Sequence, residues 1–160
     1  MLPNFLKPYH TALSNLIRLG RKSDGGYVID KRVISKTRAI ITCGLEAEWS
    51  FEKQFQEYNK NCKILAFDHT VNRKFWTKRF LRDFISLLLL KQIKLIKIID
   101  LFKFFQYLIF FRGKNKHYLK KIVSKKTKQN NQITISEAIG DNKDIILKVD
   151  IEGDEYKVLK

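Results

Sequence analysis

Three short apolar runs, each followed by a glycine or an acid, stand out in the hydrophobic pattern of the chain. They cover residues 39–43, 63–67 and 145–151. Each is too short for an independent helix and is nearly continuous, which is typical of strands buried on both faces of a parallel sheet. Between the first two runs, residues 49–58 place Phe51, Phe55 and Tyr58 on one helical face. The succession of strand, helix and strand predicts an α/β fold with a mostly parallel, Rossmann-like sheet.

The run at 145–151 departs from a purely buried strand. Lys148, Asp150 and Glu152 share the face opposite to Leu147 and Val149, because side chains alternate along a strand. Unpaired charges are costly to bury, so this face is expected to open onto a crevice. Open α/β sheets bind their ligands beyond the carboxyl ends of strands, which makes these three residues site candidates. The alternative is a Lys148–Asp150 ion pair at the end of an ordinary strand.

The first 30 residues predict a helix and a hairpin. Residues 9–19 place Leu13, Leu16, Ile17 and Leu19 at helical spacing. Asp24-Gly25-Gly26 then predicts a tight turn into a short strand at 27–29, since consecutive glycines tolerate positive φ angles.

Gly44 follows the first buried run, and Asp68 closes the second one, 24 residues later. A strand, a glycine turn and a helix allow backbone N–H groups to approach a bound nucleotide or carboxylate. An acid at the end of the next strand is placed to accept hydrogen bonds from ribose hydroxyls. No Gly-x-Gly-x-x-Gly stretch is present, so the glycines by themselves do not indicate a dinucleotide site. No metal site is expected, because Asp150 and Glu152 supply too few oxygen ligands.

The segment 73–131 predicts a basic, helical insertion within a single domain of residues 1–160. Residues 73–128 carry 17 basic side chains against two acidic ones, a net of +15 within a total of +16. Its apolar stretches are broken by charges before they reach the roughly 20 residues that span a bilayer, so two or three short helices are expected. A third strand at 117–123, a solvated loop at 125–132 and a helical turn at 136–140 with Ser136 as its N-cap complete the interpretation.

At three places the sequence resembles the FkbM-like methyltransferases. Lys148-Val-Asp-Ile-Glu-Gly-Asp-Glu155 is similar to their signature, which reads Lys-hydrophobic-Asp-hydrophobic-Glu-Gly-x-Glu. Thr42-Cys-Gly-Leu-Glu-Ala-Glu-Trp-Ser-Phe-Glu52 resembles their first motif, with Glu46 where that motif usually has its second glycine. Gly20-Arg-Lys-Ser-Asp-Gly-Gly-Tyr-Val28 is similar to an element that lies near the active-site mouth in one branch of the family.

The resemblance implies an S-adenosylmethionine-dependent enzyme that methylates a hydroxyl oxygen, on a sugar or glycan-like acceptor. It implies that Gly44 and Glu46 neighbour the methionine part of the cofactor and that Asp68 holds the ribose. The acceptor hydroxyl would face Asp150, Glu152 and Lys148, with Asp150 as a candidate general base. Asp24 and Tyr27 become candidates for binding the substrate.

A different class of function remains open, namely a binding module that uses the basic insertion to contact an anionic membrane or a nucleic acid. The acidic row at 148–152 would repel a polyanion, so nucleic acid is the less favoured partner.

Two cysteines at opposite ends of neighbouring strands, Cys43 and Cys62, would be too far apart for a disulfide, and the first residues lack the features of a signal peptide. A cytoplasmic protein is expected, with peripheral contact to the membrane as an alternative. The last apolar run lies close to residue 160, so the sequence also predicts the amino-terminal part of a longer enzyme, whose edge strand at 145–151 would be open.

Overall fold

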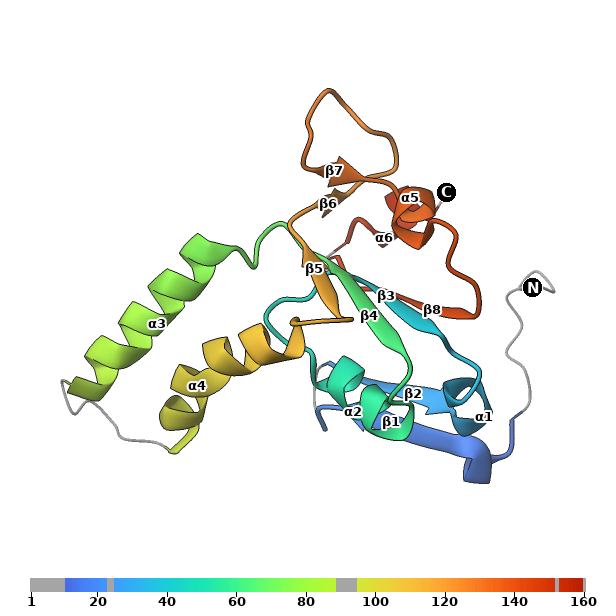
Figure 1. The fold of residues 1–160 in the computed structure, drawn as a ribbon, viewed down its shortest axis with the longest axis horizontal. Helices are drawn as coiled ribbons and strands as arrows, with labels where there is room; N and C mark the ends of the chain where they lie inside the picture. The colour runs from blue at the N-terminus through green and yellow to red at the C-terminus, as the bar shows by residue number, and fades with distance from the viewer. Residues whose placement is uncertain (1–10, 23–24, 89–94, 152, 160) are drawn as a thin grey trace.

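A four-stranded parallel sheet forms the centre of the protein (Figure 1). The computed structural model describes residues 11–22, 25–88, 95–151 and 153–159. The strands of the sheet lie in the order β5-β4-β3-β8, and every neighbouring pair is parallel. Their bounds are β3 Ala39–Cys43, β4 Lys63–Phe67, β5 Lys116–Tyr118 and β8 Ile145–Val149. The mixed α/β class and the mostly parallel sheet are therefore confirmed, and β8 is indeed an edge strand of this sheet.

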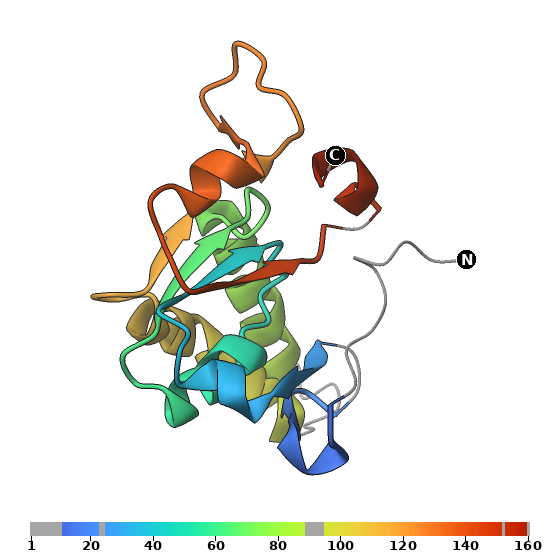
Figure 2. The ribbon, with the colours of Figure 1, turned by 90° about the vertical axis from the view of Figure 1, so that its right-hand side faces the viewer.

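The central strands β3 and β4 are almost entirely apolar because both faces of the sheet are covered, as Figure 2 shows. On one face, α2 (Ser50–Tyr58) and the β1–β2 hairpin cover Ile40, Ile64 and Ile146. On the other face, α5 (Ile135–Ile139) packs with Ile41 and Leu147. All five residues of β3 are buried, as expected for the strand between β4 and β8. Helix α2 buries Phe51 and Phe55 as predicted, whereas Tyr58 is exposed.

The N-terminal region contains a hairpin, but the predicted helix at 9–19 is wrong over the described residues 11–19. A single 3₁₀ turn at Leu13–Asn15 leads into β1 (Leu16–Gly20), which pairs antiparallel with β2 (Gly26–Asp30). Leu19 is the one buried residue of β1, and it joins the core beneath α2. Pairing with β2 and this contact outweigh the helical spacing of a short segment, for which helix and strand patterns overlap. A four-residue helix, α1 (Lys31–Ile34), follows the hairpin.

The basic insertion contains two helices of 16 residues each, α3 (Arg73–Leu88) and α4 (Leu95–Phe110). They contact one another and extend from one side of the sheet (Figure 1). No helix among the described residues is long and apolar enough to cross a membrane.

Beyond α4, the structure corrects two local predictions. The single strand expected at 117–123 is two strands: β5 joins the central sheet, while β6 (Lys121–Ile122) pairs with β7 (Gln132–Ile133). The N-cap of α5 is Thr134 and not Ser136, because Thr134 and Glu137 form a reciprocal capping box. The last helix, α6, spans Glu155–Val158.

The two cysteines are free and buried, as expected from their places at opposite ends of β3 and β4. Burial raises the pKa of the Cys43 thiol to about 12 and that of Cys62 to about 11. Both thiols are therefore protonated near neutral pH and behave as core residues.

Candidate functional site

Three loops leave the carboxyl edge of the sheet. The first residue of each loop donates a backbone hydrogen bond to the neighbouring strand and so fixes the start of the loop. The backbone N–H of Gly44 donates to the carbonyl of Phe67 at 3.0 Å, and that of Asp150 donates to the carbonyl of Cys43 at 2.8 Å. The N–H of Asp68 donates to the carbonyl of Tyr118 at 3.1 Å. The ladder thus continues one residue beyond each strand, which sets Gly44, Asp68 and Asp150 side by side at one end of the sheet.

Gly44 occupies a position that only glycine can fill. Its φ angle is +86°, and a Cβ atom there would lie 1.7 Å from the carbonyl oxygen of Asp150. Any side chain would therefore push the loop after β3 away from the loop after β8. The glycine keeps these two loops in contact.

The Asp68 side chain holds the loop after Gly44. Its Oδ2 accepts hydrogen bonds from the backbone N–H groups of Leu45 and Glu46 at 2.8 and 3.1 Å. Its Oδ1 accepts from the N–H and the hydroxyl of Thr70 at 2.7 and 2.6 Å. Burial acts to raise the pKa of this carboxyl, but these hydrogen bonds outweigh it and hold the pKa below its ordinary value. Asp68 is therefore a charged clamp, and its predicted contact with a ribose would require a ligand hydroxyl to replace one of these donors.

Glu46 and Ala47, which follow in this loop, have left-handed backbones with φ angles of 45° and 58°. Residues other than glycine adopt this conformation at a cost of about 1–2 kcal/mol each. The hydrogen bond from the Glu46 N–H to Asp68 helps to hold the strained turn. A glycine at position 46, as in the resembled motif, would adopt the same backbone without this cost.

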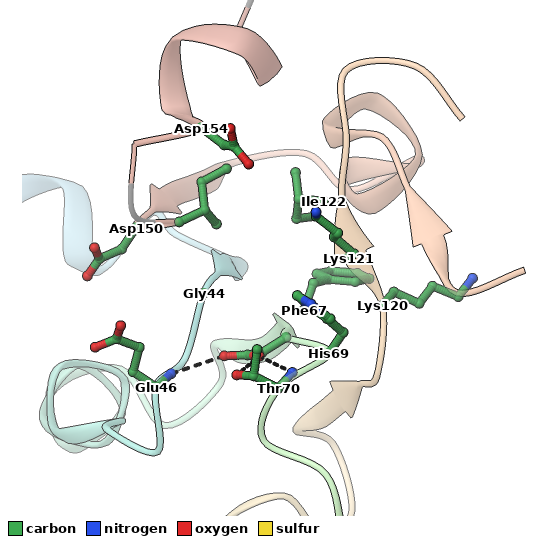
Figure 3. Close-up of a pocket in the computed structure, with 12 residues that line it drawn as sticks. Gly44, Glu46, Phe67, His69, Thr70, Lys120, Lys121, Ile122, Asp150 and Asp154 are labelled. Atoms are coloured by element: carbon green, nitrogen blue, oxygen red, sulfur yellow. Dashed lines mark hydrogen bonds between the residues drawn. The ribbon is translucent and has the colours of Figure 1, made fainter. Parts of the chain in front are cut away.

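A cavity of about 440 Å³ opens above these loops (Figure 3). Its lining includes the following residues: Gly44, Glu46, Asp68, Thr70, Lys120, Lys121, Asp150 and Asp154. It lies at the point where the strand order reverses: β4 and β5 lie on one side of β3, and the later strand β8 lies on the other side. Such a reversal point is where doubly wound sheets bind ligands, and the volume falls in the range of about 300–1,000 Å³ typical of small-molecule sites.

A second cavity of about 210 Å³ shares three residues with the first, namely Gly44, Glu46 and Asp150. Its lining is rich in charge and includes the following side chains: Arg21, Glu48, Arg79, Lys103 and Lys148. Glu48 forms ion pairs with Arg21 and, at 3.2 Å, with Lys103. The two cavities therefore adjoin across the loop that begins at Gly44.

Lys148 is 9% exposed and is paired with a residue that the sequence interpretation missed. Its Nζ lies 3.2 Å from Oε1 of Glu52, which is fully buried and also accepts a hydrogen bond from the Thr42 hydroxyl at 2.8 Å. No ion pair joins Lys148 to Asp150 among the described residues, although both line the smaller cavity. The signal for Glu52 was its place in the Ser-Phe-Glu triplet, next to buried Phe51.

Tyr27 reaches the site from the β1–β2 hairpin. Its hydroxyl donates a hydrogen bond to Oδ2 of Asp150 at 2.8 Å, and its ring lies 5.0 Å from the Lys148 ammonium. A cation over an aromatic face is attracted by the negative charge of the ring surface. Tyr27 therefore fixes one oxygen of Asp150, while Oδ1 has no partner among the described residues.

A hydrogen-bonded histidine links α4 to the Asp68 loop. The ring Nε2 of His117 lies 3.0 Å from the carbonyl oxygen of Asp68, and its Nδ1 lies 2.5 Å from the Tyr107 hydroxyl. A carbonyl can only accept, so Nε2 carries the proton and Nδ1 accepts from Tyr107. Burial lowers the pKa of His117, and the carbonyl of Asp68 offsets this only in part. The imidazole is therefore neutral near pH 7.

The structure brings together six of the eight site residues expected from the sequence. They are Gly44, Glu46, Asp68, Asp150, Lys148 and Tyr27. Asp24 and Glu152 lie outside the described residues. Among the described residues, no group of three or more potential ligands is placed to hold a metal ion. Sequence reasoning missed Glu52, Thr70, Lys120 and Asp154, because their roles depend on loops that meet only in the fold.

The comparisons with known proteins give no match: no protein-family model fits the chain, and neither a curated protein nor a solved structure resembles it significantly. The geometry of the two cavities and the motifs that lie around them are therefore the features that bear on the function of this chain.

Proposed function

We propose that the chain binds S-adenosylmethionine in the larger cavity and transfers its methyl group to a hydroxyl oxygen presented in the smaller one. The observation that carries this proposal is the pair of adjoining cavities at the point where the strand order reverses, which share Gly44, Glu46 and Asp150 in their linings. Two substrates that react with each other need adjoining sites that open onto one another, so that the reacting atoms can come within about 3–3.5 Å. The motif resemblance at 42–52 and 148–155 supports the same assignment.

The charges of the larger cavity suit this cofactor. Glu46 and Asp150 present carboxylates on one side of the loop at Gly44, while Lys120 and Lys121 lie on the other side of the cavity (Figure 3). S-adenosylmethionine carries a sulfonium and an ammonium group together with one carboxylate, so a lining of both signs can match it. A polyphosphate nucleotide would instead meet the carboxylates of Glu46, Asp150 and Asp154, which disfavour it.

The chain's own residues would then position the acceptor and take its proton. The cofactor would supply an electrophilic methyl group, and its sulfur would keep the electron pair of the broken C–S bond. Oδ1 of Asp150 would take the hydroxyl proton as the C–O bond forms. Tyr27 holds Oδ2 of the same carboxylate, which orients it. Lys148 is held in place by its ion pair with Glu52, and its ammonium group supplies a positive charge in the lining of the smaller cavity. Positioning of this kind can contribute much of the rate of a two-substrate reaction.

Calorimetric titration tests this proposal without knowledge of the acceptor. S-adenosylhomocysteine should bind the purified chain with a dissociation constant within the range of about 1 μM to 1 mM that enzymes show for their substrates. ATP, as the matched adenosine compound with a polyphosphate, should bind far more weakly. Stronger binding of ATP than of S-adenosylhomocysteine would contradict the proposal. The polar acceptor expected from the motif resemblance, a sugar or glycan hydroxyl, agrees with the charged lining of the smaller cavity.

A further inference from the structure

From Phe102 to Phe110, the part of helix α4 whose side chains the structure describes, the helix is apolar on two opposite faces. Its inner face places Tyr107, Phe110 and Phe111 around Trp49, with ring centroids 5.9, 6.4 and 6.4 Å from the Trp49 ring. Its outer face exposes four large apolar side chains, Phe102, Phe105, Leu108 and Ile109, of which Ile109 is 75% exposed. Because these residues follow one another at helical spacing, they form one stripe on the surface. A surface helix normally has a polar outer face, so this stripe requires a partner.

Helix α3 shows a similar outer face with positive charges between the apolar residues. Trp76 faces inward and is buried, while Leu81, Phe84 and Ile85 are exposed. The exposed cations of this face are Lys74, Lys78 and Arg82. Lys74 and Lys78 have no carboxylate partner within the described residues. The outer faces of the two helices, here called the helix pair, thus combine apolar side chains with uncompensated positive charge.

We infer that the helix pair is an interaction surface for an anionic lipid bilayer, on which α3 and α4 lie in the plane of the interface. The exposed apolar side chains would enter the boundary between headgroups and acyl chains, and the cations would contact anionic headgroups. Each helix has 16 described residues, fewer than the roughly 20 that span a bilayer, so the proposed contact is with one leaflet.

The composition of the surface favours lipid over nucleic acid. Besides the phenylalanines at 84, 102 and 105, this surface exposes leucine and isoleucine at positions 81, 85, 108 and 109, which offer no hydrogen bonds and no rings on which bases could stack. Single-stranded nucleic acids are bound by cations together with stacking aromatic rings, and duplexes by cations and polar side chains. Branched aliphatic side chains at the outermost positions are instead suited to a hydrocarbon environment.

Helices α3 and α4 also contribute side chains to the lining of the smaller cavity. Contact with a bilayer would therefore affect how an acceptor reaches this cavity. Arg79 of α3 and Lys103 of α4 line that cavity, and Tyr107 of α4 is hydrogen-bonded to His117 beside the Asp68 loop. A bilayer bound to the outer faces would therefore hold the cavity at a short distance from the lipid surface. An acceptor carried by the membrane could then enter it without dissociating from the bilayer.

Vesicle flotation with the full chain tests the inference. The protein should float with phosphatidylcholine vesicles that contain about one third phosphatidylserine and should float poorly with phosphatidylcholine alone. The double variant Phe105→Ser/Ile109→Ser and the double variant Lys74→Glu/Lys78→Glu should each lower the partition coefficient more than about tenfold, because the first removes two apolar side chains from the hydrocarbon boundary and the second reverses two charges that face anionic headgroups.

Two matched variants control for general apolar and charge effects. Leu13→Ser/Leu119→Ser removes exposed apolar side chains elsewhere, and Lys125→Glu/Lys128→Glu makes the same charge change in an exposed loop. Both should bind vesicles like the parent protein, and circular dichroism should show all four variants folded, because the altered side chains are exposed. Equal loss in the controls, or no difference between the two vesicle types, would overturn the inference. So would binding of a single-stranded oligonucleotide that depends on Lys74 and Lys78 but not on Phe105 and Ile109, or self-association that is lost in Phe105→Ser/Ile109→Ser without any vesicle binding.

Discussion

The edge of the sheet and the helix pair place their charged side chains in different surroundings. At the sheet edge, Asp68 accepts four close hydrogen bonds and Lys148 is paired with buried Glu52. On the helix pair, Lys74 and Lys78 lie in solvent beside exposed leucine and isoleucine. Paired charges in a buried position fix one geometry, as a reaction site requires. Unpaired charges beside apolar residues leave a surface that can bind another surface, so the two regions are suited to different tasks.

The largest expected effect comes from the buried ion pair at the sheet edge. Glu52→Ala leaves Lys148 buried without its partner and should lower the free energy of unfolding by about 3–5 kcal/mol. Urea denaturation measures this loss. The double variant Glu52→Leu/Lys148→Met removes both charges and should recover most of the stability, whereas Lys157→Ala, at an exposed ion pair, should change little. If Glu52→Ala is as stable as the parent, the pair does not hold the site.

A pair of glycine variants separates backbone strain from the contact between loops. Gly44 and Gly113 have φ angles of +86° and +84°, but only Gly44 has a neighbouring backbone atom where a Cβ would lie. Gly113→Ala should cost about 1–2 kcal/mol through its left-handed backbone alone. Gly44→Ala should cost more than this and should also abolish binding of S-adenosylhomocysteine. Equal losses of stability, measured by urea midpoints, would show that the loops after β3 and β8 can separate without penalty.

Substitution of Asp68 should change the binding of S-adenosylhomocysteine more than it changes the structure of the rest of the molecule. Asp68→Ala removes a charge-assisted acceptor and should weaken binding of S-adenosylhomocysteine by about 1.5–3 kcal/mol, measured by calorimetry. Asp83→Asn on α3 changes a carboxylate outside both cavities and should leave the affinity unchanged. An unchanged affinity in Asp68→Ala would remove this residue from the site.

The smallest expected effect is a change of stability with pH. It arises from His117, which links α4 to the loop at Asp68. The folded pKa of His117 lies below its ordinary value of 6.5, so near and just below this pH the unfolded chain binds the proton more readily. Stability from this residue is therefore fully present above about pH 6.5 and decreases as the pH falls towards the folded pKa. Chemical denaturation at pH 7.5 and pH 5.5 should show the decrease in the parent protein and a flatter profile in His117→Gln. The lowered pKa of Asp68 acts only at more acidic pH, below its ordinary value of 3.8.

The sequence predicted the strands β3, β4 and β8 of the central sheet. The strands at 39–43 and 63–67 and most of the run at 145–151 were clear because strands covered on both faces are apolar throughout. The helix predicted at 9–19 was wrong because Leu19 alone is buried in β1, and a short segment of this kind fits two periods. The separation of β5 from β6 depends on pairing with β4 and β7, which no local pattern records.

The candidate site was predicted in part for a similar reason. Gly44, Asp68 and Asp150 each follow a buried strand, so their neighbourhood could be deduced from the rule that parallel strands end at one edge. The partner of Lys148 could not be deduced, since Glu52 lies 96 residues away in the chain. The saturation of the Asp68 carboxylate by Leu45, Glu46 and Thr70 likewise arises from turns that a sequence pattern does not specify.

Backbone amide spectra of the ¹⁵N-labelled chain, titrated with S-adenosylhomocysteine, test the central claim most directly, because they report both regions in one experiment. The account predicts that the amides of Gly44, Leu45 and Glu46 and those of residues 68–70 and 120–122 shift together with one dissociation constant. The exposed face of α4, from Phe102 to Ile109, should shift little. Shifts concentrated on the helix pair, or no shifts at millimolar ligand, would contradict the assignment of an adenosyl site to the edge of the sheet.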